Sequence, residues 1–426
     1  MRRLQEEKML PDSRLRHLLS SKLMLLVVAT LLLTPVAAFS ADFDLVPTVF
    51  PNNVTEGNTV TFQVQVTGDE LASPIYVYFD LSGDPTITTS DFSGGANVSF
   101  TDFAGTLTIT GGVTDGQTVP LPIVLNDDVL VESDEFFGIA ITGVSVGNGI
   151  GTPAVATIVD NDMADISIDD VTVTEGSGGA PVTASFTVSL SNALDADLTL
   201  EYATSNGTAL AGSDYTGIAT TLLTIPASQM SGTIDVTVIG DDVVEPSSQT
   251  FFVNLSNASA PGRNVNITDN QGLGTITDDG DTATVQIASG DRGKAVAEGD
   301  TNVTYTVELV GDIDAALTGD VTVSYGFDQG GTDTAEAADY ADVTPGTVTL
   351  NLASRTYAIV LNIVDDAIVE PGEDFTFDLT GVSAPFDVVL GGASEIQSST
   401  SIDPDGSDTA TVQIASGDRG KAVSEG

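Results

Sequence analysis

Residues 232–240 read GTIDVTVIG, and Ile234, Val236 and Val238 alternate there with polar residues. A period of two is typical of a β-strand that buries one of its faces. The stretch TFFVNLSN at 250–257 shows the same alternation. The sequence therefore predicts two half-buried strands joined by the loop between these stretches.

The same pattern recurs throughout residues 165–279, in seven short runs separated by clusters of Gly, Asn, Ser and Pro. The runs are DISIDDVTVTEG, TASFTVSLS, LTLEYATS, TTLLTIP, GTIDVTVIG, TFFVNLSN and GLGTITDD. No long window after residue 41 shows helical periodicity. Seven strands in a segment of this length predict an all-β fold, a seven-stranded immunoglobulin-like β-sandwich.

The chain repeats itself at a regular interval. The stretch DTATVQIASGDRGKAVAEG at 281–299 recurs with one change at 408–426. A Glu-Gly pair closes similar stretches at Glu56, Glu175, Glu298 and Glu425. This spacing indicates a tandem array of sandwiches with a period of about 120 residues. We predict modules at 42–162, 163–281 and 282–408, and a truncated fourth module that starts at 409–426.

Acidic side chains gather in particular loops of every repeat. If the strands are labelled A to G and neighbours run in opposite directions, the A–B, C–D and E–F loops and the exit of strand G share one end of the sandwich. The acids predicted to converge there are, in the first repeat, Glu56, Asp91, Asp127, Asp128, Glu132, Asp160 and Asp162. In the second repeat they are Glu175, Asp214, Asp241, Glu245, Asp278, Asp279 and Asp281. In the third they are Glu298, Asp339, Asp365, Asp366, Glu370, Asp403 and Asp405.

This concentration of like charge needs a physical reason. Two carboxylates 4 Å apart repel by about 4 kcal/mol at an effective dielectric constant near 20. Ca²⁺ takes six to eight oxygen ligands and suits carboxylates on flexible loops, so we expect calcium at this pole. The alternative interpretation is that the acids are solvated loop residues.

Other chemistries lack their residues. The chain has no cysteine, and its one histidine, His17, lies in the N-terminal segment, which excludes thiolate or imidazole zinc sites and histidine-based nucleophile systems from the repeats. Paired carboxylates serve glycosidases, but tryptophan is absent and no aromatic sugar platform accompanies them. We therefore expect no enzymatic activity in this span.

The acidic loops also carry motifs that resemble the Calx-beta family. They read TSNGTALAGSDYTG at 204–217, TITDDGD at 275–281 and DDAIVEPGEDF at 365–375. The resemblance implies sandwich modules that bind Ca²⁺ at one pole through the Glu-Gly glutamate, the aspartate before Tyr, the E–F acids and the tail aspartates.

Two repeats depart from the family pattern. The first has TTSDF at 88–92 in place of GSDY. In the second, Gln249 stands where Glu135 and Glu373 stand in the other repeats, and its E–F spacing is shifted by one residue. We therefore expect the second site to need more calcium than the third.

The N-terminus predicts export. Residues 1–41 carry six of the twelve basic residues, and the apolar run LMLLVVATLLL at 23–33 is followed by small residues. This order is typical of a signal peptide, and the run is short for a membrane span of about 20 residues. An uncleaved anchor is the alternative. We expect a protein that is secreted or held at the cell surface, with no membrane span after cleavage.

The charge of the remaining chain limits its partners. The formal net charge is −49, and beyond residue 41 there are 58 acids against six bases. Such a surface repels nucleic acid and anionic membranes and attracts cations. We expect an adhesive or structural stalk that calcium rigidifies, with a cell-surface or matrix ligand. The alternative is a passive spacer for an enzyme or ligand-binding domain beyond residue 426.

Overall fold

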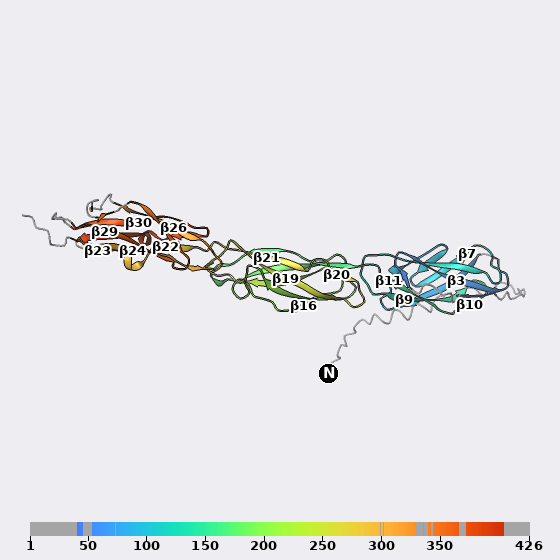
Figure 1. The fold of residues 1–426 in the computed structure, drawn as a ribbon. Coiled ribbons are helices and arrows are strands. Elements are labelled where there is room, and N and C mark those ends of the chain that lie inside the picture. The colour runs from blue at the N-terminus through green and yellow to red at the C-terminus, as the bar shows by residue number, and fades with distance from the viewer. Residues whose placement is uncertain are drawn as a thin grey trace, which may run out of the picture. The chain divides into compact units, whose positions relative to one another are not determined.

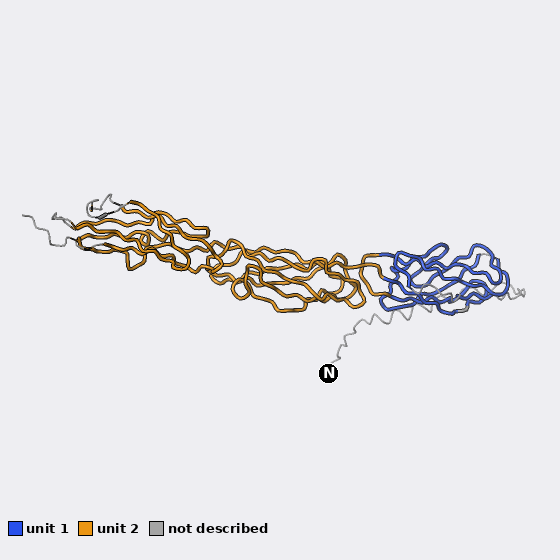
Figure 2. Tube along the Cα trace, viewed as in Figure 1, with its two compact units in different colours: residues 1–127, 135–159 blue, residues 128–134, 160–426 orange. Residues whose placement is uncertain are grey.

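The computed structural model describes residues 41–45, 53–72, 74–298, 300, 302–328, 335, 340–341, 344–365 and 372–403. Contacts divide the chain into two compact units, one of residues 1–127 with 135–159 and the other of residues 128–134 with 160–426 (Figure 2). Strands dominate both units, as the sequence predicts (Figure 1). Within the described residues, no helix has the length and apolar character needed to cross a bilayer.

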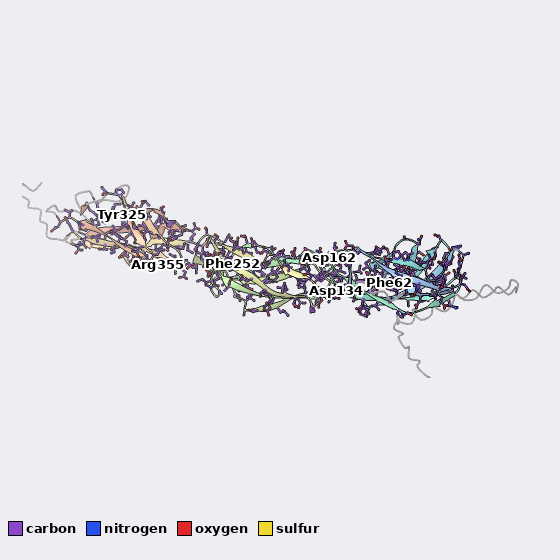
Figure 3. The ribbon with its side chains drawn as sticks, turned by 45° about the vertical axis from the view of Figure 1, so that its right-hand side comes forward. Phe62, Asp134, Asp162, Phe252, Tyr325 and Arg355 are labelled. Atoms are coloured by element: carbon purple, nitrogen blue, oxygen red, sulfur yellow. The ribbon has the colours of Figure 1, made fainter. Side chains whose placement is uncertain are left out.

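The first repeat forms two sheets, with strand orders β10-β1-β3-β8-β5 and β2-β11-β9-β4-β7-β6. Its strands are β1 (Ala41–Leu45), β2 (Asn53–Thr55), β3 (Thr59–Gly68), β4 (Ile75–Gly83), β5 (Phe92–Gly94), β6 (Val98–Thr101), β7 (Ala104–Ile109), β8 (Thr118–Leu125), β9 (Glu135–Val144), β10 (Asn148–Ile150) and β11 (Ala154–Val159). A 3₁₀ turn, η2 (Thr89–Asp91), precedes β5. The hydrophobic core lies between the two sheets and includes the fully buried Phe62 (Figure 3).

The second repeat pairs the sheet β17-β14-β12-β20 with the sheet β13-β21-β19-β15-β16. Its strands are β12 (Ala164–Ile168), β13 (Val171–Thr174), β14 (Val182–Leu190), β15 (Leu198–Asn206), β16 (Thr221–Ile225), β17 (Ser231–Val238), β18 (Val243–Val244), β19 (Ser248–Ser259), β20 (Val265–Ile267) and β21 (Gln271–Thr277). A short 3₁₀ turn, η3 (Ser177–Gly179), lies between β13 and β14. Each of the seven predicted runs contains a strand.

The first predicted run is two strands rather than one. The division falls at Asp169 and Asp170, whose side chains bond to different sheets. Asp169 accepts a hydrogen bond from the N–H of Thr187 on β14 at 2.6 Å, and Asp170 accepts one from Leu273 on β21 at 2.7 Å. The chain therefore crosses from one sheet to the other between β12 and β13, where it forms parallel pairs with β20 and β21 respectively.

The third repeat pairs the sheet β27-β29-β24-β22-β31 with the sheet β23-β32-β30-β26-β28. Its strands are β22 (Ala283–Ile287), β23 (Lys294–Ala297), β24 (Val303–Val310), β25 (Asp312–Ile313), β26 (Asp320–Asp328), β27 (Tyr340–Ala341), β28 (Gly346–Asn351), β29 (Thr356–Ile363), β30 (Glu373–Ser383), β31 (Val388–Leu390) and β32 (Gln397–Asp403). The helical turns are η4 (Ser289–Asp291) and α1 (Ala393–Ile396).

A parallel strand pair brings the Glu-Gly glutamate to the same pole as the strand G exit in each repeat. Strand β13 runs parallel to β21 with Thr174 opposite Thr277, so Glu175 and Asp278 are the next residues on adjacent strands. The pairs β2–β11 and β23–β32 have the same arrangement. The backbone N–H of Glu175 extends the ladder by donating to the Thr277 carbonyl at 3.0 Å.

The core of the second sandwich is centred on stacked aromatic rings. Phe251 on β19 stacks on Tyr215, with ring centroids 4.5 Å apart and planes inclined by 18°, and meets Phe186 edge-on at 5.9 Å. All three side chains are fully buried, at no more than 1% exposed. Tyr215 directly follows Asp214, so this stack also fixes the C–D loop at the acidic pole.

Replacing Phe251 with alanine should strongly destabilise the second sandwich. We expect the free energy of unfolding to fall by about 3–5 kcal/mol, because the change removes a buried ring and leaves a cavity beside Tyr215. Urea unfolding followed by hydrogen exchange within residues 164–277 measures this loss. Phe252→Ala is the matched control, since Phe252 lies on the other face of β19 and is only half-buried. Equal losses for the two variants would contradict the assignment of faces.

Candidate metal centre

Glu175 occupies the centre of the acidic pole in the second sandwich. It follows β13 immediately, and the parallel ladder with β21 fixes its backbone. The residue is 6% exposed, and its Oε1 atom is buried with no hydrogen-bond partner. A buried carboxylate oxygen without a partner is unfavourable unless a proton or a cation satisfies it.

Two glycines bring the E–F loop, between β17 and β19, against the A–B loop, between β13 and β14. A side chain on Gly240 would place Cβ 1.6 Å from the carbonyl oxygen of Gly176, so only glycine permits this approach of the two backbones. The N–H of Gly178 then donates to Asp242 Oδ1 at 2.8 Å, and the N–H of Val243 donates to Asp241 Oδ1 at 2.8 Å. The Gly-Asp-Asp stretch of the E–F loop therefore reaches the pole close to Glu175.

The acids that follow β21 complete the group. Asp278 Oδ2 accepts the N–H of Gly280 at 3.1 Å, and the backbone N–H of Glu245 also donates to the Asp278 carboxylate. Asp278 Oδ1 and Asp281 Oδ2 are buried atoms with no hydrogen-bond partner. Asp279 accepts a hydrogen bond from Ser177 Oγ. The tail thus presents carboxylate oxygens that the protein itself leaves unsatisfied.

Asp214 comes to the pole from the C–D loop. It is 6% exposed, and its Oδ2 atom accepts the N–H of Leu210 at 2.6 Å. The backbone N–H of Ile239, just before the E–F loop, donates to the Asp214 carbonyl at 3.0 Å. These bonds connect the C–D loop to the E–F loop, so the predicted convergence of loops is present in the second sandwich.

The electrostatics of this cluster show in its pKa values. Burial, followed by the charges of Asp278, Asp241, Asp279 and Asp281, raises the pKa of Glu175 to about 7. Burial, followed by the charge of Glu175 and then of other acids, raises the pKa of Glu245 to about 8. Burial is also the main cause of the raised pKa values of Asp278 and Asp281. Burial and neighbouring negative charges are what raise these pKa values, so the pole would favour an added cation.

The donor set suits a hard cation. Only oxygen donors converge, from carboxylates on several loops, and the buried oxygens of Glu175, Asp278 and Asp281 have no other partner. Ca²⁺ accepts such irregular oxygen sets more readily than Mg²⁺, which requires near-octahedral geometry. Glu175, Asp241, Glu245, Asp278 and Asp281 are the residues best placed to hold it.

Gln249 lies at the position that the sequence comparison gave it. On β19 it lies opposite Ile276 of β21. Glu135 lies opposite Ile158 and Glu373 opposite Ile402 in the other repeats. It is 3% exposed, and its Nε2 atom is buried without a partner. An amide here contributes an oxygen but no charge, so a weaker second site stays a prediction.

In the first repeat, the tail and the E–F loop show the same contact as in the second. The N–H groups of Glu132 and Asp162 each donate to Asp160 at 3.1 Å. Burial outweighs these two bonds and, together with the charges of Asp128 and Asp134, raises the pKa of Asp160. Glu56, Asp160 and Asp162 are each half-buried.

Other predicted acids of the first repeat have local roles. Both carboxylate oxygens of Asp91 bond to Thr88, one to its hydroxyl at 2.8 Å and one to its N–H at 2.5 Å, which forms a capping box for η2. Asp128 Oδ1 accepts the N–H of Leu130 at 2.7 Å. Asp127 lies beside Gly57, where an added Cβ would come within 3.4 Å of its side chain, and Gly57 has a φ of +75° in the A–B turn. Asp91 therefore bonds with both of its carboxylate oxygens inside its own turn.

The third repeat is described only in part at this pole. Glu298 is 7% exposed, and its N–H donates to the carbonyl of Asp403 at 3.0 Å, as the parallel pair requires. Asp365 and Asp403 are exposed. The other acids predicted in this repeat, Asp339, Asp366, Glu370 and Asp405, lie outside the described residues.

Four acids near these poles were not among the sequence predictions. Asp242 belongs to the same Asp-Asp pair as Asp241, and Asp134 follows Glu132 closely. Asp314 and Asp387 come from loops of the third repeat, yet their charges raise the pKa values of Glu245 and Asp278 in the second. A sequence reading that treats each repeat alone cannot find these two, because they belong to the opposite end of their own sandwich.

Comparisons with known proteins agree with the fold. The Calx-beta domain profile matches residues 53–164, 160–291 and 278–405. The chain therefore belongs to the Calx-beta family, whose domains are calcium-binding regulatory modules rather than catalytic ones. A search of curated proteins found no match.

Several solved structures are similar to parts of the chain. The CBD12 segment of CALX1.2 is 19% identical, with 56% of this chain and 99% of that chain covered and a TM-score of 0.25. The calcium-binding domain CBD12 of CALX1.1 is 17% identical, with 56% and 99% covered and a TM-score of 0.25. The apo form of the Calx CBD1 domain is 27% identical, with 27% and 97% covered and a TM-score of 0.24. The family assignment rests on the three domain matches.

The raised pKa values predict an unusual pH dependence in the absence of calcium. With pKa values of about 7 and about 8, Glu175 and Glu245 hold protons in the folded state that they release when unfolded. Because the folded protein then binds more protons, the free energy of unfolding should fall as the pH rises from about 5 to about 8. Thermal unfolding in chelator across this range measures the trend, and Glu175→Gln should flatten it. If the free energy of unfolding of the parent protein instead rises with pH over this range, the raised pKa values of Glu175 and Glu245 are wrong.

Proposed function

We propose that this chain is a calcium-binding array whose sandwiches hold Ca²⁺ at their acidic poles, and that it serves outside the cell as a structural or adhesive stalk. The observation that carries the calcium proposal is the set of buried, unpartnered carboxylate oxygens on Glu175, Asp278 and Asp281. The family of the chain supports the choice of ion. The signal-like N-terminus and the tandem repeats support the extracellular role.

The residues of the pole have separate tasks in this proposal. A bound Ca²⁺ would supply positive charge and accept several oxygen ligands at once. Glu175 and Asp278, fixed side by side by the parallel strands, provide the rigid part of the donor set. Asp241 and Glu245 come from the E–F loop, which Gly240 and the Asp242–Gly178 hydrogen bond hold against the A–B loop. Asp214 adds charge from the C–D loop.

Binding would also stabilise the fold. The carboxylates repel one another without a cation, so the folded state gains free energy when calcium joins them. A ligand at a hundredfold excess over its dissociation constant adds about 2.7 kcal/mol per site. The acids lie where one repeat ends and the next begins, so we propose that calcium stiffens both the modules and their linkers.

Calcium titration of the intact array tests the first part of the proposal. Calorimetry and terbium luminescence should detect binding below about 1 mM, the range of extracellular calcium modules. Glu175→Gln should weaken the second site at least about tenfold, since it removes a buried ligand charge. The matched control is Asp235→Asn, which removes one exposed charge from β17 and should leave affinity unchanged. No binding up to about 10 mM would end the calcium proposal.

Small-angle scattering of the array tests the second part. We expect calcium to increase the maximum dimension and narrow its distribution, and chelator to reverse both effects, because bound ions would restrain the linkers. The melting temperature should rise in parallel. If calcium binds while the scattering profile stays the same, the array is a passive spacer rather than a calcium-stiffened stalk.

A further inference from the structure

The E–F loop of the second sandwich inserts a residue into the third. Val244 precedes Glu245, is 1% exposed and packs in the hydrophobic core of the third sandwich. Its strand, β18, pairs in parallel with β25 of the third repeat, with Val244 opposite Ile313. The loop that carries candidate metal ligands is therefore part of the joint between the two sandwiches.

This pairing places an acid of the third repeat beside the second pole. The backbone N–H of Asp314 donates to the carbonyl of Val244 at 3.0 Å, so Asp314 lies next to the residue that precedes Glu245.

Val131 makes a contact with the second sandwich that resembles the contact of Val244 with the third, but it differs in one respect. Val131 packs in the core of the second sandwich, and the N–H of Asp195 donates to its carbonyl at 3.2 Å, as Asp314 does to Val244. Arg263 binds both carboxylate oxygens of Asp195, at 2.7 and 2.6 Å. Asp195 therefore already has a cationic partner within its own sandwich.

The third repeat lacks that arginine. The carbonyls of Asn264 and Asp387 accept equivalent hydrogen bonds from Ala164 and Ala283, so Arg263 corresponds to Phe386. Among the described residues, no ion pair includes Asp314. Arg263 neutralises Asp195, the residue equivalent to Asp314. Asp314 instead adds an uncompensated charge to a pole that already holds the buried, unpartnered oxygen of Glu175.

We propose that the third sandwich completes the cation site of the second, with Asp314 as a further calcium ligand, acting directly or through one water. This inference rests on the proposed calcium function and extends it across a joint. The ion would then connect two modules, and the insertion of Val244 would hold Asp314 at the distance that the site needs.

Asp314→Asn in the intact array tests the inference. We expect calcium affinity at the second site to fall about fivefold to tenfold, because one ligand charge is lost. Asp312→Asn is the matched control, since it removes the same charge from an exposed residue two positions earlier and should change affinity less than about twofold. Melting temperatures in chelator should be no lower for Asp314→Asn than for the control, which separates loss of a ligand from loss of structure.

A double variant identifies the site through which Asp314 acts. In the Glu175→Gln background, where the second site is already weakened, Asp314→Asn should have little further effect. If the parent binds calcium and Glu175→Gln weakens it, but Asp314→Asn behaves like Asp312→Asn, the inference is overturned and the proposed function stands. If Glu175→Gln also leaves calcium binding unchanged, both are overturned.

Discussion

The parallel pairing of the strand before each Glu-Gly pair with the last strand of its sandwich is the constraint on which the acidic pole depends. Two parallel strands end at the same edge of a sheet. Thr174 lies opposite Thr277, so the residues that follow them, Glu175 and Asp278, leave the sheet side by side. An antiparallel pair would have put the glutamate and the tail acids at opposite ends. The same register in β2–β11 and β23–β32 makes this geometry a property of the repeat.

This constraint gives the carboxylates little freedom to separate. Backbone hydrogen bonds fix Glu175 and Asp278, and the Gly240–Gly176 approach fixes the E–F loop. Surface acids normally lower their repulsion by moving apart into water, which these cannot do. The raised pKa values of Glu175 and Glu245 express the unfavourable energy that results. The strands and hydrophobic core thus hold together a group of charges that is unstable without a proton or a cation.

Much of this arrangement could be predicted from the sequence. The alternation of apolar residues in stretches such as 232–240 gives the strands, and the order of the loops gives the convergence of Glu175, Asp214 and the E–F acids. What the sequence could not give depends on contacts between distant residues. Asp169 and Asp170 look alike in sequence, yet they bond to different sheets and divide the first strand. The local capping role of Asp91 depends on Thr88, and the roles of Asp314 and Arg263 depend on how adjacent repeats meet.

A crystal structure of the array grown in calcium, with the ion identified by anomalous scattering, tests the central claim most directly. The account predicts one or more ions at the second pole, with oxygens of Glu175, Asp278 and at least one E–F acid at about 2.3–2.6 Å. Ions found only at exposed acids elsewhere, or a pole that stays empty at saturating calcium with Glu175 protonated, would contradict it.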